Sequence, residues 1–191
     1  MTERPILFSG PMVRAILDGR KTQTRRAIRP QPEWIRQWLN PAVRSMKWKG
    51  TVWNPATSAW GPYRFTDRLW VKETFNACAG KPFYRADGQM HADWKWRPSI
   101  FMPRKYSRID LEIMDLRVER IREITEPDAK AEGCSDCPYL MPGEAVRFLG
   151  CENFALMRFR NLWDDLNAGR GYGWVENPAV WVVEFKVVPK C

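Results

Sequence analysis

Three segments of the chain alternate apolar and polar side chains with the period of two residues that a β-strand requires. They are Arg68–Phe75, Ile109–Ile113 and Val180–Val188. In the first segment Leu69, Val71 and Glu73 share one face, and a carboxylate at the end of such an inward-facing row is unusual. Beyond the second segment the apolar residues continue in a shifted phase, which predicts a bulge or bend near Asp115.

Helical spacing and capping residues predict helices between these strands. We expect helices over Met12–Asp18, from Thr125 through Ala131, and over Cys151–Asn167. The first should end at Gly19, where a left-handed conformation costs glycine little. The second should start at Thr125 as N-cap and stop near Gly133. Further short strands are expected at Ile6–Phe8 and Phe83–Ala86, and Thr22–Ile28 reads as a loop that enters a strand. Together, these strands and helices predict an α+β fold around a partly closed barrel.

The chain of 191 residues fits one domain, 1–191. Residues 30–62 are rich in Pro, Trp and Asn and predict an insertion over one mouth of the fold, with a helix over Pro32–Leu39. The tryptophans in this stretch have two open interpretations: they stack bases, or they complete a core. No apolar run approaches the roughly 20 residues of a membrane span, and no signal peptide is visible. An odd number of cysteines argues against a disulfide framework, so we expect a cytoplasmic protein with no membrane contact.

The positive charge of the chain is concentrated near its start. The formal net charge is +9, and residues 1–50 contain eleven Lys and Arg against three acidic residues. These cations repel one another unless an anion binds among them, which favours a phosphate-bearing partner. The alternative is a basic surface that serves solubility alone.

The string from Gly19 to Arg26 combines a glycine turn with several cations and a hydroxyl. The pKa of Lys21 would fall readily on burial, so that it could act as a base. Thr24 offers a hydroxyl that such an amine could activate. Arg26 suits bidentate contacts with phosphate or carboxylate.

The sequence resembles the ASCH domain family, relatives of the PUA-like RNA-binding barrels. Gly19, Lys21 and Arg26 match its G-x-K-x-x-x-x-R signature, and the flanking blocks look like those of ASCH proteins encoded by bacteriophages and prophages. These blocks are Pro5–Arg26, Asp67–Phe75, Met102–Arg104 with Ser107–Ile109, and Asn177–Phe185. Residues 30–62 and about 134–150 match no block, which suggests a second insertion at 134–150.

The resemblance implies a β-barrel of about five to seven mostly antiparallel strands with short flanking helices, a cleft lined by the motif, and no cofactor. It implies RNA or a modified nucleoside as the ligand, held by the residues Gly19, Arg20, Arg25, Arg26 and Arg104. In amidohydrolase members a Lys, a Thr and a Glu act together, and these fall on Lys21, Thr24 and Glu73. A hydrolase on an acylated pyrimidine nucleoside, or a ribonuclease, is therefore expected; the alternatives are a non-catalytic RNA-binding module and a phage accessory protein.

Simpler interpretations of these residues stay open. Lys21 and Arg26 could form a solvated basic turn, and Glu73 could form a structural ion pair with Arg25 or Arg26. Thr24 is an ordinary strand residue. Cys134 and Cys137 have the spacing of a zinc knuckle, with Cys151 and His91 as further candidates, but no second pair follows, so we expect reduced thiols and no metal.

Overall fold

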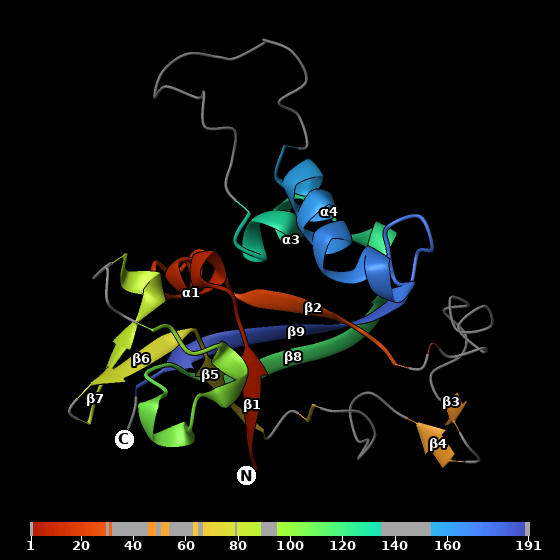
Figure 1. Cartoon of the computed structure of the whole chain (residues 1–191). Coiled ribbons are helices and arrows are strands. Elements are labelled where there is room, and N and C mark those ends of the chain that lie inside the picture. Colours follow the sequence, from red (N-terminus) through yellow and green to blue (C-terminus); the bar gives the residue numbers. More distant parts are fainter. Residues whose placement is uncertain are drawn as a thin grey trace.

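The computed structural model describes residues 2–29, 31, 63–64, 67–78, 80–88, 95–134 and 154–189, and the backbone of 46–48 and 51–53. Its main sheet has five strands in the order β1, β5, β8, β9, β2 (Figure 1). Their bounds are Glu3–Leu7, Arg68–Lys72, Asp110–Arg120, Ala179–Val188 and Gln23–Ala27. The β1–β5 pair is parallel and the other three pairs are antiparallel. The predicted α+β class is confirmed, but within the described residues β1 and β2 remain edges, so the sheet is not closed into a barrel.

Two small hairpins accompany the main sheet. β6 (Phe75–Cys78) pairs with β7 (Lys81–Tyr84), and β3 (Met46–Trp48) pairs with β4 (Thr51–Trp53). Short 3₁₀ turns follow several strands and α4, namely η1 (Arg85–Asp87), η2 (Ser99–Phe101), η3 (Arg104–Tyr106), η4 (Ile121–Glu123) and η5 (Ala168–Arg170). The predicted helix Pro32–Leu39, nearly all of 30–62 and all of the insertion at 134–150 except Cys134 lie outside the described residues.

The expected strands are present, and the bulge is where the change of phase predicts it, between Ile113 and Asp115. The segment Thr22–Ile28, interpreted as a loop that enters a strand, contains β2, whose backbone pairs along β9. In β9 Trp181 and Val182 both lie in apolar clusters, on opposite faces, because this strand lies inside the sheet and is covered on both sides.

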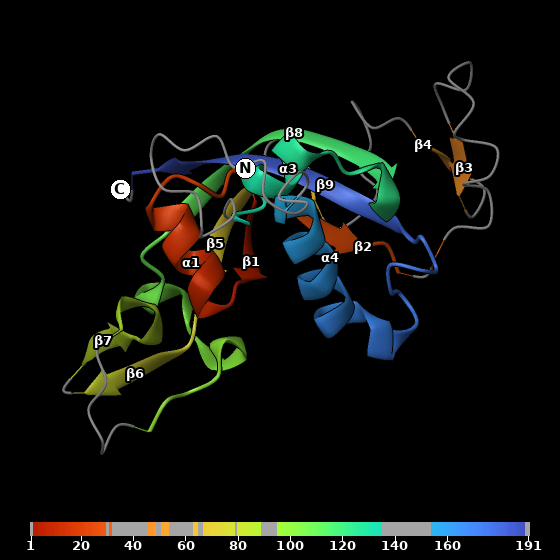
Figure 2. The ribbon, with the colours of Figure 1, turned by 90° about the horizontal axis from the view of Figure 1, so that it is seen from above.

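In the part of the chain that the structure describes, three helices pack on the sheet: α1 (Gly10–Leu17), α3 (Glu126–Ala131) and α4 (Phe154–Asn167). α1 belongs to the apolar cluster of Trp181, whereas α3 and α4 belong to that of Val182, on the opposite face of β9. In the view of Figure 2, α1 and α4 are seen apart, with β1 between them. Thr125 caps α3 as predicted, since its side chain accepts a hydrogen bond from the backbone N–H of Asp128. None of the helices described is long and apolar enough to cross a membrane.

The ends of α1 and α3 meet through Gly133. This glycine has a φ of +89°, and a Cβ at that position would lie 2.9 Å from the Cβ of Ala15 and 3.2 Å from that of Lys21. Both the left-handed conformation and the close approach therefore require glycine. As a result the end of α3 lies against Lys21, and the backbone N–H of Thr22 donates to the carbonyl of Ala131 at 2.9 Å.

Candidate functional site

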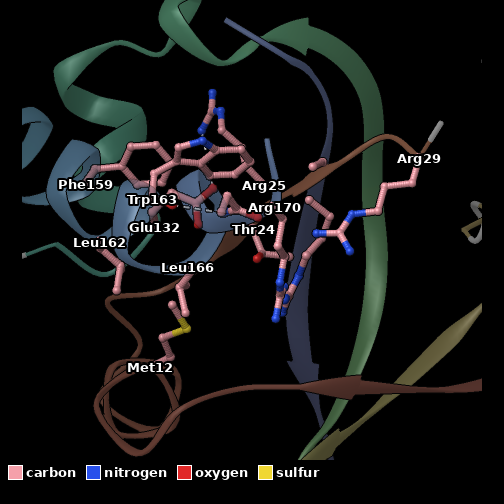
Figure 3. A pocket seen from close by; sticks show the side chains of 13 residues that line it. Met12, Thr24, Arg25, Arg29, Glu132, Phe159, Leu162, Trp163, Leu166 and Arg170 are labelled. Carbon is pink, nitrogen blue, oxygen red and sulfur yellow. Dashed lines mark hydrogen bonds and ion pairs between the residues drawn. The ribbon is translucent and has the colours of Figure 1, made fainter. Parts of the chain in front are cut away.

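A cavity of about 310 Å³ lies where α1, β2, the end of α3 and α4 meet, and we call it the α1–α4 cavity (Figure 3). The residues that line it are Met12, Thr24, Arg25, Arg26, Ala27, Arg29, Glu132, Phe159, Leu162, Trp163, Leu166, Asn167 and Arg170. The lining therefore includes part of the predicted motif and one face of α4.

The apolar wall of this cavity comes mainly from α4. Phe159, Leu162, Trp163 and Leu166 follow the three- and four-residue spacing of one helix face, and Met12 of α1 also lines the cavity. The Trp163 indole N–H donates to the carbonyl of Tyr172 at 2.8 Å. The rings of Phe159 and Trp163 stack with their centroids 6.1 Å apart, so the wall is held in place before any ligand arrives.

The floor of the cavity is built on a buried ion pair between Lys21 and Glu132. Lys21 is 1% exposed, and its Nζ donates to the Glu132 carboxylate at 2.8 Å, to the Glu132 carbonyl at 2.7 Å and to the Gln23 carbonyl at 2.8 Å. Burial lowers the pKa of Lys21 below its ordinary value, and the Glu132 carboxylate opposes this shift. The Lys21–Glu132 pair therefore combines an amine of lowered pKa with nearby hydrogen-bond acceptors.

Arg25 supports Glu132 from the other side. Its side chain is fully buried, and its guanidinium lies 3.4 Å from the Glu132 carboxylate, 2.9 Å from that of Glu119 and 3.3 Å from that of Asp128. The Nε of Arg25 has no hydrogen-bond partner among the described residues. Hence Arg25 serves as the shared cation of three carboxylates, and its charge is not free to hold a ligand.

Thr24 and Arg26 lie in the same cavity. Thr24 is buried in β2, and within the described residues Nζ of Lys21 donates to Gln23 and Glu132 rather than to Thr24. Arg26 donates to the carbonyl of Leu7 at 2.7 Å and stacks over the Phe8 ring at 5.2 Å. Thr24 and Arg26 thus line the α1–α4 cavity, whereas Lys21 is not among its lining residues and contacts it through Glu132.

Glu73 lies outside the α1–α4 cavity. It is 1% exposed and accepts two hydrogen bonds from Arg108, at 2.9 and 3.0 Å. Arg108 also pairs with Asp87 at 2.6 Å and lies over the Tyr84 ring at 3.9 Å. An ion pair of Glu73 was an open interpretation of the sequence, but its partner is Arg108 rather than Arg25 or Arg26.

Glu73 lines a second cavity, of about 390 Å³. The other residues that line this cavity are Ser9, Gly10, Pro11, Arg14, Thr74, Arg85 and Ala86. The second cavity shares no lining residue with the α1–α4 cavity. The catalytic role of Glu73 therefore stays a prediction, and nothing in these contacts connects it to Thr24.

The remaining predicted ligand residues have structural partners. Gly19 has a φ of +72° and ends α1 as expected. Arg20 is exposed and pairs with Asp18 at 2.7 Å. Arg104 pairs with Glu3 at 2.8 Å and with Asp110 at 2.9 Å, which holds η3 against β1 and the start of β8.

Glu132 is the main residue of this site that the sequence interpretation missed. It follows the last residue of α3, where the helix dipole disfavours a negative charge. A carboxylate at a predicted helix C-terminus therefore indicates a specific cation partner, and this was the available signal. The partner itself, Lys21, is 111 residues away in the chain.

The proposed zinc ligands fall mostly outside the described residues, which do not include Cys137, Cys151 or His91. In the part that the structure describes, no three His, Cys, Asp or Glu side chains are grouped to hold a metal. Burial raises the pKa of the Cys134 thiol to about 11, so this thiol is protonated at neutral pH.

The comparisons with known proteins concern the fold. No family model and no curated protein matches the sequence. The structure is similar to an ASCH domain from Lactobacillus crispatus, with 11% identity, a TM-score of 0.44, and coverage of 97% of this chain and 79% of that one. It is also similar to a DUF984 protein from Enterococcus faecalis, with 8% identity, a TM-score of 0.48, and coverage of 98% and 81%. Both likenesses concern the fold alone.

Arg25 and Arg20 provide a matched test of the floor. Arg25→Met should lower the free energy of unfolding by about 3–5 kcal/mol, because it leaves three carboxylates around a buried site without their shared cation. Arg20→Met should change it little, since its ion pair with Asp18 is exposed. Urea denaturation of both variants measures the difference, and equal losses would contradict the role given to Arg25.

Proposed function

We propose that the α1–α4 cavity binds a nucleoside, either free or as a unit of RNA. The observation that supports this most strongly is the pairing, in one cavity, of an aromatic and aliphatic wall with a hydrogen-bonding floor. Its volume of about 310 Å³ lies at the lower end of small-molecule sites, which span roughly 300–1,000 Å³. A planar base packs against a wall such as Phe159 and Trp163, and its polar edge needs partners such as Thr24.

The charges of the cavity agree with such a ligand. The Glu132 carboxylate accepts hydrogen bonds from ring or exocyclic N–H groups, and the Thr24 hydroxyl both donates and accepts. Arg26 donates to a base carbonyl. The excess of cations in residues 1–50 raises the local concentration of any polyanion around the site.

Two exposed residues of α4 test the site with a matched control. Leu166 is 49% exposed and lines the cavity, whereas Met157 is 52% exposed on the same helix and does not. Leu166→Trp should weaken binding by about tenfold, which corresponds to about 1.4 kcal/mol, because the larger indole occupies space in the cavity that the ligand requires. Met157→Trp should leave the affinity unchanged.

The measurement is isothermal titration of each variant with the four ribonucleosides and their 5′-monophosphates, with the melting temperature recorded in parallel. Equal affinities of the two variants would place the ligand outside the α1–α4 cavity. Absence of binding to every compound by the wild-type protein would remove the proposal.

A second candidate function is hydrolysis of an acylated pyrimidine nucleoside, favoured by the lowered pKa of Lys21 and by its contact with Glu132, which lines the same cavity as Thr24. In this proposal Lys21 first passes a proton to the Glu132 carboxylate. Thr24 then attacks the amide carbonyl carbon and its hydroxyl proton moves to Lys21, while Glu132 protonates the leaving amine nitrogen. Water cleaves the acyl-threonine, giving one proton to Glu132, and Lys21 returns its own to the Thr24 oxygen.

The carboxylate that serves this reaction can be identified by two variants. Glu132→Gln should lower the turnover of N4-acetylcytidine by at least about a hundredfold, as loss of a general acid or base does. Glu73→Gln should retain turnover, since Glu73 pairs with Arg108 in the second cavity. Loss of turnover in Glu73→Gln, with turnover retained in Glu132→Gln, would assign the catalytic carboxylate to Glu73 instead. Nucleoside binding by the wild-type protein without turnover would favour the non-catalytic module.

A further inference from the structure

We propose that Arg29 and Arg170 form a phosphate subsite at the edge of the α1–α4 cavity, so that its ligand is a nucleotide unit and not a bare nucleoside. This inference rests on the proposed function and deepens it, because it names the anionic group that the ligand carries. Neither arginine belongs to the motif from Gly19 to Arg26.

The fold brings these two arginines together from distant parts of the chain. Arg29 follows the end of β2, and Arg170 ends η5, the turn after α4. Both line the cavity. Figure 3 shows Phe159 and Leu162 on one side of the view and Arg29 on the other, with Arg170 between them. A ligand whose ring packs on the wall therefore extends toward two guanidinium groups.

Arg29 is oriented by a structure that also fixes the wall. Its guanidinium lies 4.9 Å from the ring centroid of Tyr172, a cation–π contact. Tyr172 in turn accepts, through its carbonyl, the hydrogen bond from the Trp163 indole at 2.8 Å. The same residue thus holds both the cation and the aromatic surface, so the distance between them is set before the ligand binds.

The charge around the subsite favours a dianion. Among the described residues that line the cavity, Glu132 is the single carboxylate, and it already pairs with Lys21 and Arg25. Arg29 and Arg170 are exposed, so a phosphate there keeps part of its hydration. Planar guanidinium groups match the geometry of phosphate oxygens with paired N–H donors.

The test compares each ribonucleoside with its 5′-monophosphate by isothermal titration, on the full chain. The wild-type protein should bind the best monophosphate at least about tenfold tighter than the matching nucleoside, because charge-assisted hydrogen bonds to phosphate are strong. In the Arg29→Gln/Arg170→Gln double variant this ratio should fall to near one. Arg122→Gln is the control, since it removes one exposed cation outside the cavity and should keep the preference.

Two further arms complete the experiment. On the wild-type protein, inorganic phosphate should weaken the binding of the monophosphate by competition. In the double variant, inorganic phosphate should not change the affinity for the monophosphate. A single-stranded hexaribonucleotide that binds tighter than the monophosphate identifies an RNA strand as the source of the phosphate, and equal affinity identifies a free nucleotide; both results support the subsite.

The proposal is overturned if the wild-type protein binds nucleosides and monophosphates equally well, or if the double variant, folded by its circular dichroism spectrum, keeps the preference. These results differ from failure of the proposed function itself, in which the wild-type protein binds no nucleoside or nucleotide at all. The single variants Arg29→Gln and Arg170→Gln repeat the comparison with one charge removed.

Discussion

The buried ion pair between Lys21 and Glu132 is the interaction on which the rest of the site depends. It joins the turn between α1 and β2 to the end of α3, two segments that are far apart in the sequence. Removing either partner would leave an uncompensated charge away from water, which costs far more than the pair itself contributes. The pair also requires Gly133, because no larger residue fits between Ala15 and Lys21.

Charged side chains around the Lys21–Glu132 pair fix the position of its carboxylate. Arg25 binds the second oxygen of Glu132 and also contacts Glu119 and Asp128, and Arg117 in turn pairs with Glu119 at 2.5 Å. Electrostatic interactions inside a protein are stronger than in water, and a satisfied network fixes the position of each member. A ligand that reaches the floor therefore meets a carboxylate whose orientation is already determined, next to an apolar wall.

Much of the fold could be predicted from local patterns in the sequence, whereas the candidate site could be predicted only in part. Alternation predicts β5, β8 and β9, and Thr125 predicts the start of α3, because these signals depend on near neighbours. Likewise Lys21, Thr24 and Arg26 come from one short string. The partners Glu132 for Lys21 and Arg108 for Glu73 could not be read from the sequence, since each pairing depends on how distant segments pack. The face of α4 that becomes the wall also depends on its rotation against β2.

The most direct measurement of the central claim is the pKa of Lys21 itself, followed by ¹⁵Nζ NMR across an alkaline titration of the folded protein. Because burial disfavours the charged amine, we predict a value below the ordinary 10.5. The value should fall further in the Glu132→Gln variant, since the carboxylate of Glu132 raises the pKa of its partner. A Lys21 pKa at or above 10.5, unaffected by Glu132→Gln, would show a solvated basic turn and contradict the buried pair.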